Sequence, residues 1–528
     1  MRVFMMEKEL LSQLMEMTKQ LSEITVQLQE LSMQNRLLRE ENEYLKKKLF
    51  GTKSETKKSL GYDQASLFNE AEVEFDETRE EYKVVKEHQR RKKQKGFIEE
   101  KFKNIPHEKV LYDLPESMKQ CPRCKTELSK VGEEFLRYEF EFVPAQLKVK
   151  EIYVATYECR KCRKVEKKSV MVTAGSPEPV IPHSYASPES VAQVMKEKFV
   201  NGVPLYRQED EWKRLGVELS RATMASWVIK ASELWLQPLV EHMHQELLKG
   251  KYVHSDETPV QVLKEPGKKA TSKSYMWVYA SIKEAEHNIR IFDYRPNRSG
   301  DNPQEFLKGF NGYNISDAYA GYNNLEGVTN VYCWAHVRRK FVDSLPKDID
   351  DINSTLAKQA IDKIGKLFEI EKTIEKYSAD EKKEYRKKNS LPILTEFFTW
   401  CDDNILKTLS GTKIYKAFSY ALNHKEGLCE YINDGYLPMT NSLDERTIRP
   451  FAIGRKNWLF STSVDGAKSS AVAYSIVSTA KANGVDPYKY LTYVFRQMPG
   501  SDFKKHPEIL EHMMPWDSKI QELCKNTL

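Results

Sequence analysis

Residues 251–263, which read KYVHSDETPVQVL, decide the fold of this 528-residue chain. The stretch is rich in Val and alternates between apolar and polar residues, which is the pattern of a β-strand. Two further runs rich in Val, Ile and Tyr, 274–282 and 288–294, follow at short spacing and predict two more strands. Beyond them the sequence predicts a short helix over 302–310, strands over 313–318 and 329–334, and a helix from His336.

Three hairpin strands followed by alternating helix and strand are the element order of the RNase H fold. Between about residues 344 and 431 the pattern becomes helical and highly charged, which predicts a helical subdomain inserted into this fold. We therefore expect a multidomain α/β protein with an RNase H-like domain over 250–460. A C-terminal segment over 461–528, rich in small residues, is expected to be helical.

Three acidic residues stand on separate elements of this predicted domain. Asp256 lies in the first strand, Asp317 lies at the end of the fourth strand, and Glu445 lies in the stretch NSLDERTIRP on a probable helix. In an RNase H layout the middle of the first strand and the end of the fourth are side by side. The two aspartates would then face each other, with Glu445 joining them from a packed helix.

Carboxylate oxygens are the ligands that Mg²⁺ and Mn²⁺ prefer in proteins. Two such ions, about 3.5 to 4 Å apart, promote in-line displacement at phosphorus, so the three acids predict a polynucleotidyl transferase or nuclease. The alternative is a set of unrelated surface acids, because the chain has 77 Asp and Glu residues. Glu257 and Asp444, the immediate neighbours, are rival metal ligands.

Basic and aromatic residues follow the third acid and also begin the helix from His336. Guanidinium and ammonium groups pair with phosphates, and an aromatic ring stacks on an unpaired base. We favour a positioning or phosphate-binding role for His336, with catalytic acid or simple packing as alternatives. The expected DNA contacts in this region are His336, Arg338, Arg339, Arg446, Arg449, Arg455, Lys456 and Trp458.

Residues 176–249 read as a helical module that resembles a helix-turn-helix. Residues 204–215 predict one helix, Gly216 ends it, and Ser220 is a plausible N-cap for the next. The second helix, with Arg221 exposed, would enter a DNA major groove. A helical scaffold without a DNA-binding role is nearly as plausible, since this spacing is weakly specific.

Residues 105–175 contain two CxxC pairs, which predict a zinc ribbon. Thiolates in a closed tetrahedron at about 2.3 Å from Zn²⁺ form a structural site. In a reducing compartment, metal ligation by such cysteine pairs is favoured over disulfides. The predicted ligands of one structural Zn²⁺ are Cys121, Cys124, Cys159 and Cys162.

Residues 1–50 carry a heptad seam that begins at Leu14 and places Asn35 and Asn42 at position a. Buried amides at these positions favour a parallel two-stranded coiled coil, so we expect a homodimer. A single amphipathic helix docked on its own domain is the alternative. Residues 51–104 have no steady period and many charges, which predicts a linker.

The chain carries a mild positive excess, a net charge of +6, which permits nucleic-acid binding without establishing it. No window reaches the roughly 18 apolar residues of a membrane span, and Glu7 and Glu9 stand where a signal peptide has its apolar core. We therefore expect a cytoplasmic protein with no membrane partner.

Taken together, these features resemble the transposases of the bacterial insertion-sequence IS-66 group, which have an acidic DDE active site. The likeness runs from the leucine zipper and paired CxxC motifs through DETP at 256–259, DAYAGY at 317–322 and CWAH at 333–336 to GRKNW at 454–458. It implies that Asp256, Asp317 and Glu445 are the catalytic triad and the metal ligands.

The resemblance also implies the reaction, which is metal-dependent nicking at the ends of a mobile element followed by attack of the freed 3′-hydroxyl on target DNA. The implied partners are the terminal inverted repeats, the target DNA and two small accessory proteins, and the implied location is the bacterial nucleoid. Many relatives read Asp-Asn-Asn before the catalytic helix, where this chain has Thr440-Asn441-Ser442. A catalytically inactive DNA-binding repressor and a structure-specific nuclease of RNase H type are the alternatives.

Overall fold

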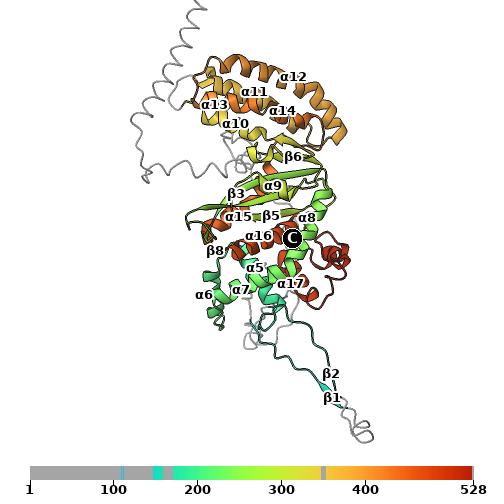
Figure 1. Ribbon diagram of the computed structural model, residues 1–528. Coiled ribbons are helices and arrows are strands. Elements are labelled where there is room, and N and C mark those ends of the chain that lie inside the picture. Colours follow the sequence, from blue (N-terminus) through green and yellow to red (C-terminus); the bar gives the residue numbers. More distant parts are fainter. Residues whose placement is uncertain (1–108, 110, 112–146, 159–170, 347–351, 526–528) are drawn as a thin grey trace, which may run out of the picture.

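The computed structural model describes residues 109, 111, 147–158, 171–346 and 352–525. The expected coiled coil, the linker and the four cysteines of the predicted zinc ribbon (Cys121, Cys124, Cys159 and Cys162) lie outside the described residues. Two short strands, β1 (Thr156–Glu158) before Cys159 and β2 (Met171–Thr173) after Cys162, pair antiparallel. They form an arm that extends away from the body of the molecule (Figure 1).

The centre of the described chain is a mixed sheet of six strands, of which β3 to β7 lie where the sequence predicts strands, whereas β8 falls in the segment expected to be helical. The antiparallel strands are β3 (Tyr252–Lys264), β4 (Lys273–Ser281) and β5 (Arg290–Arg295), and the strands parallel to β3 are β6 (Gly312–Ser316), β7 (Val328–Tyr332) and β8 (Ser461–Ser463). The spatial order is β5-β4-β3-β6-β7, and β8 pairs with the far end of β3. The chain is therefore a mixed α/β protein, as expected.

One side of strand β3 is paired at its two ends only. Strand β6 reaches as far as the pair His254 and Ile315, and strand β8 begins at the pair Val262 and Ser461. Among the described strands, none pairs with residues 255–261 on this side. Helix α15 (Ser442–Trp458) packs against β3 and β4.

The outer edge of the sheet is covered by helix α16 (Val464–Ala482). Ser475 Oγ accepts a hydrogen bond from Phe292 N at 2.8 Å, and Thr479 Oγ1 accepts one from Arg290 N at 3.0 Å. Unpaired N–H groups on an edge strand otherwise invite pairing with another chain. The C-terminal segment, which is rich in small residues, thus forms the predicted helix, and this helix lies directly on strand β5.

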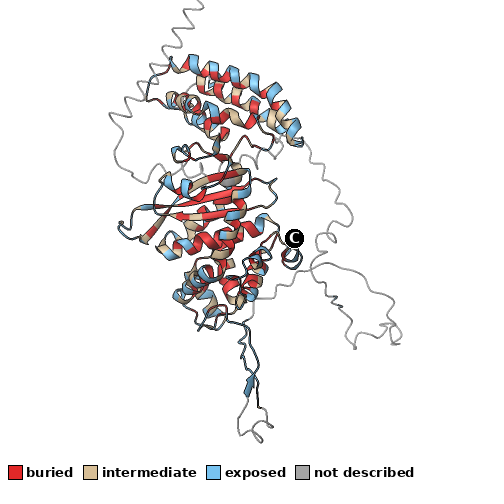
Figure 2. Cartoon of the chain, turned by 45° about the vertical axis from the view of Figure 1, so that its right-hand side comes forward, coloured by how far each residue is buried: buried red, intermediate tan, exposed pale blue. Residues whose placement is uncertain are grey.

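The helical module before the sheet shares one hydrophobic core with the sheet and the C-terminal helices. Its helices are α5 (Pro188–Phe199), α6 (Leu205–Arg214), α7 (Arg221–Ala231) and α8 (Gln237–Lys249), and α5 packs against α17 (Pro487–Gln497). Ser220 caps α7 as predicted, because its side chain accepts a hydrogen bond from Thr223 N. Figure 2 shows the buried residues of this core running from the sheet into these helices.

The predicted insertion is a helical layer with a second core, placed at the β6 and β7 side of the sheet (Figure 1). Its helices are α11 (Leu356–Thr373), α12 (Ala379–Ile405), α13 (Lys413–Asn423) and α14 (Lys425–Cys429), and α11 and α13 pack against α10 (Trp334–Asp343), which precedes the insertion. Buried Arg386 fastens α12 to α11 through Glu371 and to the returning chain through the carbonyls of Tyr431 and Leu437. The insertion is therefore a packed subdomain.

None of the helices in the described segments combines the length with the apolar character needed to cross a membrane.

Candidate active site

The register of two parallel strands brings the first two acids to the same level. His254 on β3 lies opposite Ile315 on β6. Asp256 is two residues beyond His254, and Asp317 is two residues beyond Ile315, directly after β6 ends at Ser316. Side chains two residues apart on a strand point to the same face. The two carboxylates are thus carried by neighbouring strands at one level.

The third acid is carried by helix α15, which is fastened across the unpaired interval of β3. At the start of the helix, Asn441 Nδ2 donates to the Ser255 carbonyl at 3.3 Å. About four turns later, Arg455 Nη1 donates to Thr258 Oγ1 at 3.1 Å and also to the Pro259 carbonyl. These bonds hold the helix along the part of β3 that carries Asp256, and Glu445 lies one turn inside its N-terminus.

Alternation along β3 separates the two adjacent acids, Asp256 and Glu257. His254 bonds Asn441 and Thr258 bonds Arg455, so the even-numbered side chains of this stretch face α15. Asp256 belongs to this series, whereas Glu257 points to the opposite face. There Glu257 accepts a hydrogen bond from the Tyr322 hydroxyl at 2.7 Å. Glu257 is therefore bonded away from the face that carries Asp256.

The charges of the acids act on one another. Burial raises the pKa of Asp256 well above its ordinary value, and the negative charges of Glu257, Asp317 and Glu445 raise it further. Repulsion of this kind is relieved by protonation or by a bound cation. The donor set, carboxylate oxygens only, fits a hard divalent cation. In the described residues, however, no group of three His, Cys, Asp or Glu side chains is close enough to enclose a metal ion.

Glu445 faces Arg339 and His336 of helix α10. Its Oε1 lies 3.9 Å from Arg339 Nη2 and 4.0 Å from His336 Nε2. All three side chains are partly exposed. The orientation toward α10 explains why Glu445 does not form a compact cluster with the two aspartates in this conformation.

A buried histidine supports the helix that carries Glu445. His254 Nδ1 lies 2.6 Å from Asn441 Oδ1, and burial lowers the pKa of His254 to about 4. The ring is therefore neutral near pH 7, and its Nδ1–H donates to the amide oxygen. Asn441 N also donates to Cys333 Sγ at 3.2 Å. Cys333 thus has a structural role at the start of α10.

The loop after β6 is held by the inserted subdomain. The Tyr420 hydroxyl, on α13, donates to the Asp317 carbonyl at 2.6 Å, and Lys340 Nζ lies 4.3 Å from the centre of the Tyr420 ring. Tyr319 N donates to Asp317 Oδ1 at 3.0 Å, and Ala318 between them has φ 63°. Left-handed backbone at a non-glycine residue is uncommon. The loop is therefore held by the inserted subdomain through Tyr420 and by its own backbone through Tyr319.

Family models match almost every segment of the chain. The model of the IS66 transposase family, which is of the DDE type, matches residues 183–469, more than half of the chain. The chain belongs to the IS66 transposase family. The IS66 zinc-finger binding domain matches 118–163, the IS66 C-terminal element matches 475–516, and the family "Transposase C of IS166 homeodomain" matches 37–110.

Relatives of this IS66 family member occur in Sinorhizobium fredii. The uncharacterized protein y4hP is 27% identical over 436 residues, covering 79% of this chain and 76% of its own length. The uncharacterized protein y4jD is 28% identical over 443 residues, covering 81% and 83%. The uncharacterized protein y4qI is 30% identical over 367 residues, covering 66% of each. Their similarity covers between 66% and 81% of this chain.

The residues predicted to contact DNA fall into three groups in this IS66 transposase. Arg455 and Trp458 are partly buried and make contacts within the protein, since Arg455 bonds β3 and the Trp458 ring lies edge-on to Phe451 at 5.6 Å. Arg339 and His336 face Glu445. The more exposed members are Arg221, Arg338, Arg446 and Lys456, and Arg449 is half-buried.

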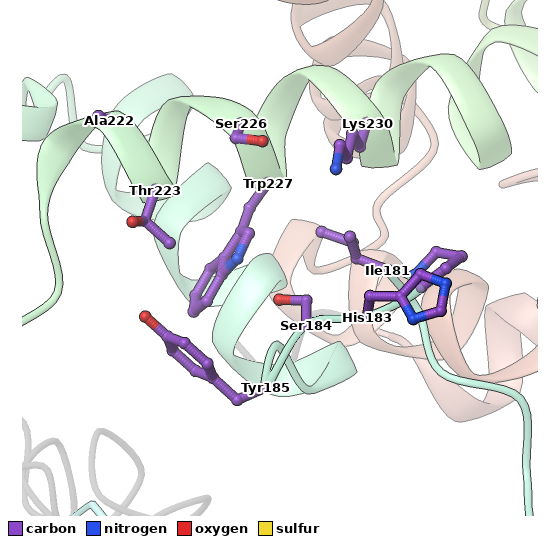
Figure 3. Close-up of a pocket in the computed structure, with 10 residues that line it drawn as sticks. Ile181, His183, Ser184, Tyr185, Ala222, Thr223, Ser226, Trp227 and Lys230 are labelled. Atoms are coloured by element: carbon purple, nitrogen blue, oxygen red, sulfur yellow. The ribbon is translucent and has the colours of Figure 1, made fainter.

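The helical module of this transposase carries a hollow of about 420 Å³ beside α7. Figure 3 shows Thr223, Ser226 and Lys230 along the helix above Tyr185, which comes from the segment before α5. The Tyr185 ring lies edge-on to Trp227 at 5.5 Å, and Tyr185 is 72% exposed. Hydroxyls, an ammonium group and an exposed ring therefore share one surface on the predicted recognition helix.

Several residues at the site were missed by the sequence patterns. Tyr420 lies in the insertion, about 100 positions from the carbonyl it bonds, so no local signal points to it. Arg298 lies in a loop with no motif of its own, although it pairs with Glu257. His254 and Tyr322 stand inside the recognised motifs, and the alternation of β3 was the signal that could have assigned His254 to the Asp256 face.

Proposed function

We propose that this chain is an active DDE transposase that cuts the ends of its element and joins the 3′-hydroxyl ends to target DNA. Asp256, Asp317 and Glu445 are the proposed catalytic residues. The observation that carries the proposal is the level placement of Asp256 and Asp317 on paired strands, with α15 fastened across β3 beside them. Membership of the IS66 transposase family supports the same assignment.

The RNase H-like identity of the sheet is part of this proposal. Three antiparallel strands followed by two strands parallel to the first, in the order β5-β4-β3-β6-β7, support it. In such a layout the centre of the first strand and the end of the fourth are neighbours, which is the relation of Asp256 to Asp317. The helical insertion between α10 and α15 leaves this arrangement intact.

The donor set and the repulsion at Asp256 fit a divalent cation. Asp256, Asp317 and Glu445 would hold Mg²⁺ or Mn²⁺, and a bound pair of such ions activates the attacking oxygen and neutralises charge at phosphorus. Because Mg²⁺ keeps several waters and takes few protein carboxylates, a fully enclosed cluster of acids is not required.

Two displacements at phosphorus make up the proposed reaction. In the first, a water oxygen attacks phosphorus, the P–O3′ bond breaks, and the 3′-oxygen leaves as a hydroxyl. In the second, this hydroxyl loses its proton and its oxygen attacks a target phosphorus, displacing the 3′-oxygen of the target strand. Arg339 balances the charge of Glu445, and exposed Arg338 on the same helix offers a cation to the incoming phosphate.

The remaining modules are proposed to recognise DNA and assemble the complex. The surface of α7 around Arg221 and the adjoining hollow would contact the terminal inverted repeats. The four cysteines within the matched zinc-finger segment would hold one structural Zn²⁺. The N-terminal seam would form a homodimer, two small accessory proteins would join it on DNA, and the complex would be associated with the nucleoid.

The test is a cleavage and strand-transfer assay with duplex DNA that carries an element end. Asp256→Asn, Asp317→Asn and Glu445→Gln should each abolish Mg²⁺-dependent nicking while preserving the fold in circular dichroism. The matched control is Glu305→Gln, an exposed acid that pairs with Arg295 away from the three acids, and it should cleave normally. Cleavage retained by one of the three variants would remove that residue from the mechanism.

The same assay separates the other functions. Nicking of branched DNA without joining of ends would indicate a structure-specific nuclease. Salt-dependent binding of element ends without any nicking, in the presence of the accessory proteins, would indicate a repressor.

A further inference from the structure

A second functional cluster lies on the opposite face of β3, around the acid that does not face α15. Glu257, whose side chain is 1% exposed, forms an ion pair with Arg298 from the loop between β5 and α9 (Asp301–Phe306). Arg298 Nε donates to Glu257 Oε1 at 2.7 Å, and Nη2 donates to the same oxygen. The other carboxylate oxygen accepts the Tyr322 hydroxyl. Both oxygens of Glu257 are therefore occupied by protein donors.

The Arg298 guanidinium is also held over an aromatic ring next to Asp317. Its Cζ lies 3.9 Å from the centre of the Tyr319 ring, and Tyr319 N donates to Asp317 Oδ1. The Tyr319 hydroxyl in turn donates to the Arg298 carbonyl. A side chain at Gly321 would collide with the Tyr319 ring, so this glycine is required for the packing. Ring, carboxylate and backbone together fix the cation at the end of strand β6.

Arg298 retains hydrogen-bonding capacity toward solvent. Its side chain is 42% exposed, and Nη1 has no hydrogen-bond partner among the described residues. Although partial burial opposes the shift, the charges of Glu257 and then Asp317 raise the pKa of Arg298. The guanidinium is held by Glu257 at one edge and by the Tyr319 ring on one face, and its Nη1 edge is open. Such a group is suited to a planar, two-point contact with phosphate.

We infer that Arg298 binds a backbone phosphate of the DNA strand beside Asp317, and that Glu257 positions this arginine and is not a metal ligand. The inference rests on the proposed function, because it assumes that DNA enters at Asp317. It assigns different tasks to the adjacent acids: Asp256 faces the catalytic helix, whereas Glu257 orients a cation from the opposite face. Arg298 is thus a DNA-binding residue, and Glu257 is a positioning residue that acts through it.

The experiment measures DNA binding and Mg²⁺ dependence separately, in the full-length protein. A labelled duplex of the element end is titrated in EDTA at several salt concentrations. Arg298→Ala should weaken binding about tenfold, since a charge-assisted hydrogen bond is lost, and should lower the salt slope by about 1. Arg298→Lys keeps the charge without the fork, so it should keep the slope and still bind more weakly.

Glu257→Gln tests the second half of the inference. It should weaken binding as Arg298→Ala does, and the double variant should be no weaker than Arg298→Ala alone. The Mg²⁺ concentration that half-saturates both cleavage and the thermal shift should stay at the wild-type value. The matched control is Arg295→Lys, an arginine paired with Asp293 and Glu305, which should leave binding and salt slope unchanged.

Two results would overturn the inference. Unchanged affinity and salt slope in Arg298→Ala would leave Arg298 with a structural role only. A several-fold rise in the half-saturating Mg²⁺ concentration of Glu257→Gln, with normal DNA binding, would make Glu257 a metal ligand. The thermal shift reports the half-saturating Mg²⁺ concentration without cleavage, and DNA binding is measured in EDTA. Failure of the proposed function would therefore appear in the Asp256→Asn cleavage assay and leave both results readable. Melting curves verify that each variant is folded.

Discussion

His254 and Asn441 are joined by a buried hydrogen bond of 2.6 Å although 187 positions separate them in the chain. Asn441 also donates to the Ser255 carbonyl, and its backbone N–H donates to Cys333. Asn441 thus links strand β3, through its side-chain amide, to the start of α10, through its backbone N–H, and both to the start of α15. This link sets the position of the helix that presents Glu445, and it spans the whole helical insertion.

Replacing Asn441 should therefore damage both stability and activity. Asn441→Ala leaves the His254 ring and the Ser255 carbonyl without their partner, which costs about 2 to 4 kcal/mol for two buried polar groups. Unfolding by urea would measure the loss, and DNA nicking should fall with it. Ser442→Ala is the control, because its hydroxyl only accepts a contact of 3.3 Å from Thr440. Equal effects of the two substitutions would contradict this account of Asn441.

The low pKa of His254 predicts acid destabilisation. The folded ring has a pKa of about 4, below its ordinary value of 6.5, so between these values the unfolded chain binds a proton that the folded chain does not. Stability should fall as pH drops through this window, by up to about 3 kcal/mol. The free energy of unfolding, measured in urea at pH 7 and at pH 4.5, should therefore fall less between these two pH values in His254→Gln than in the wild type.

The raised pKa of Asp256 has the opposite sign, because the folded form takes up its proton first. Protonation of Asp256 therefore stabilises the fold as pH falls through the raised pKa. The His254 contribution is best isolated in an Asp256→Asn background, where this opposing term is absent. A pH dependence that is the same with His254 or Gln at this position would contradict the prediction.

Asp256→Asn should stabilise the protein without metal while abolishing cleavage. The neutral amide removes the repulsion that Asp256 experiences from Glu257, Asp317 and Glu445. A gain of about 2 °C in Tm is expected in EDTA, together with loss of the further gain that Mg²⁺ gives the wild type. Differential scanning calorimetry with and without Mg²⁺ measures both. A Tm below the wild-type value would mean that Asp256 makes favourable contacts that outweigh the repulsion.

Arg455 and Lys456 are neighbours in sequence but should differ in effect. Arg455→Ala removes the bonds to Thr258 and Pro259, so it should lower the Tm and leave the salt slope of DNA binding unchanged. Exposed Lys456 is proposed to pair with a phosphate, so Lys456→Ala should reduce the slope by about 1 with little change in Tm. Fluorescence anisotropy across salt concentrations distinguishes them. The reverse pattern would restore Arg455 as a DNA contact.

Removal of zinc should affect the ribbon and spare the sheet. Cys121→Ser takes one thiolate from the predicted tetrahedral site. The protein should lose bound zinc, measured by atomic absorption, while the near-ultraviolet circular dichroism of the buried aromatic core, which includes Trp277 and Trp334, should persist. Wild-type zinc content in the variant would exclude Cys121 as a ligand. Glu305→Gln, outside the predicted ribbon, serves as the control for zinc content.

Local patterns predicted much of the described architecture. The alternation in residues 251–263 corresponds to β3, and the hydroxyl of Ser220 caps α7. Periodicity and capping are interactions between residues close in sequence, so a single sequence carries them directly. The insertion was predictable for the same reason, because its helices are long and strongly charged. The coiled coil and zinc ribbon stay predictions, with family matches over parts of both segments.

The roles of individual side chains required the tertiary structure. The sequence by itself determined that acids stand at Asp256, Asp317 and Glu445 on elements of the right kind. Only the fold decided that Glu257 binds Arg298 on the opposite face of β3 and that Arg455 bonds β3. The physical reason is range: these contacts join residues 41 to 197 positions apart. Their geometry depends on strand register and helix packing, which no local pattern encodes.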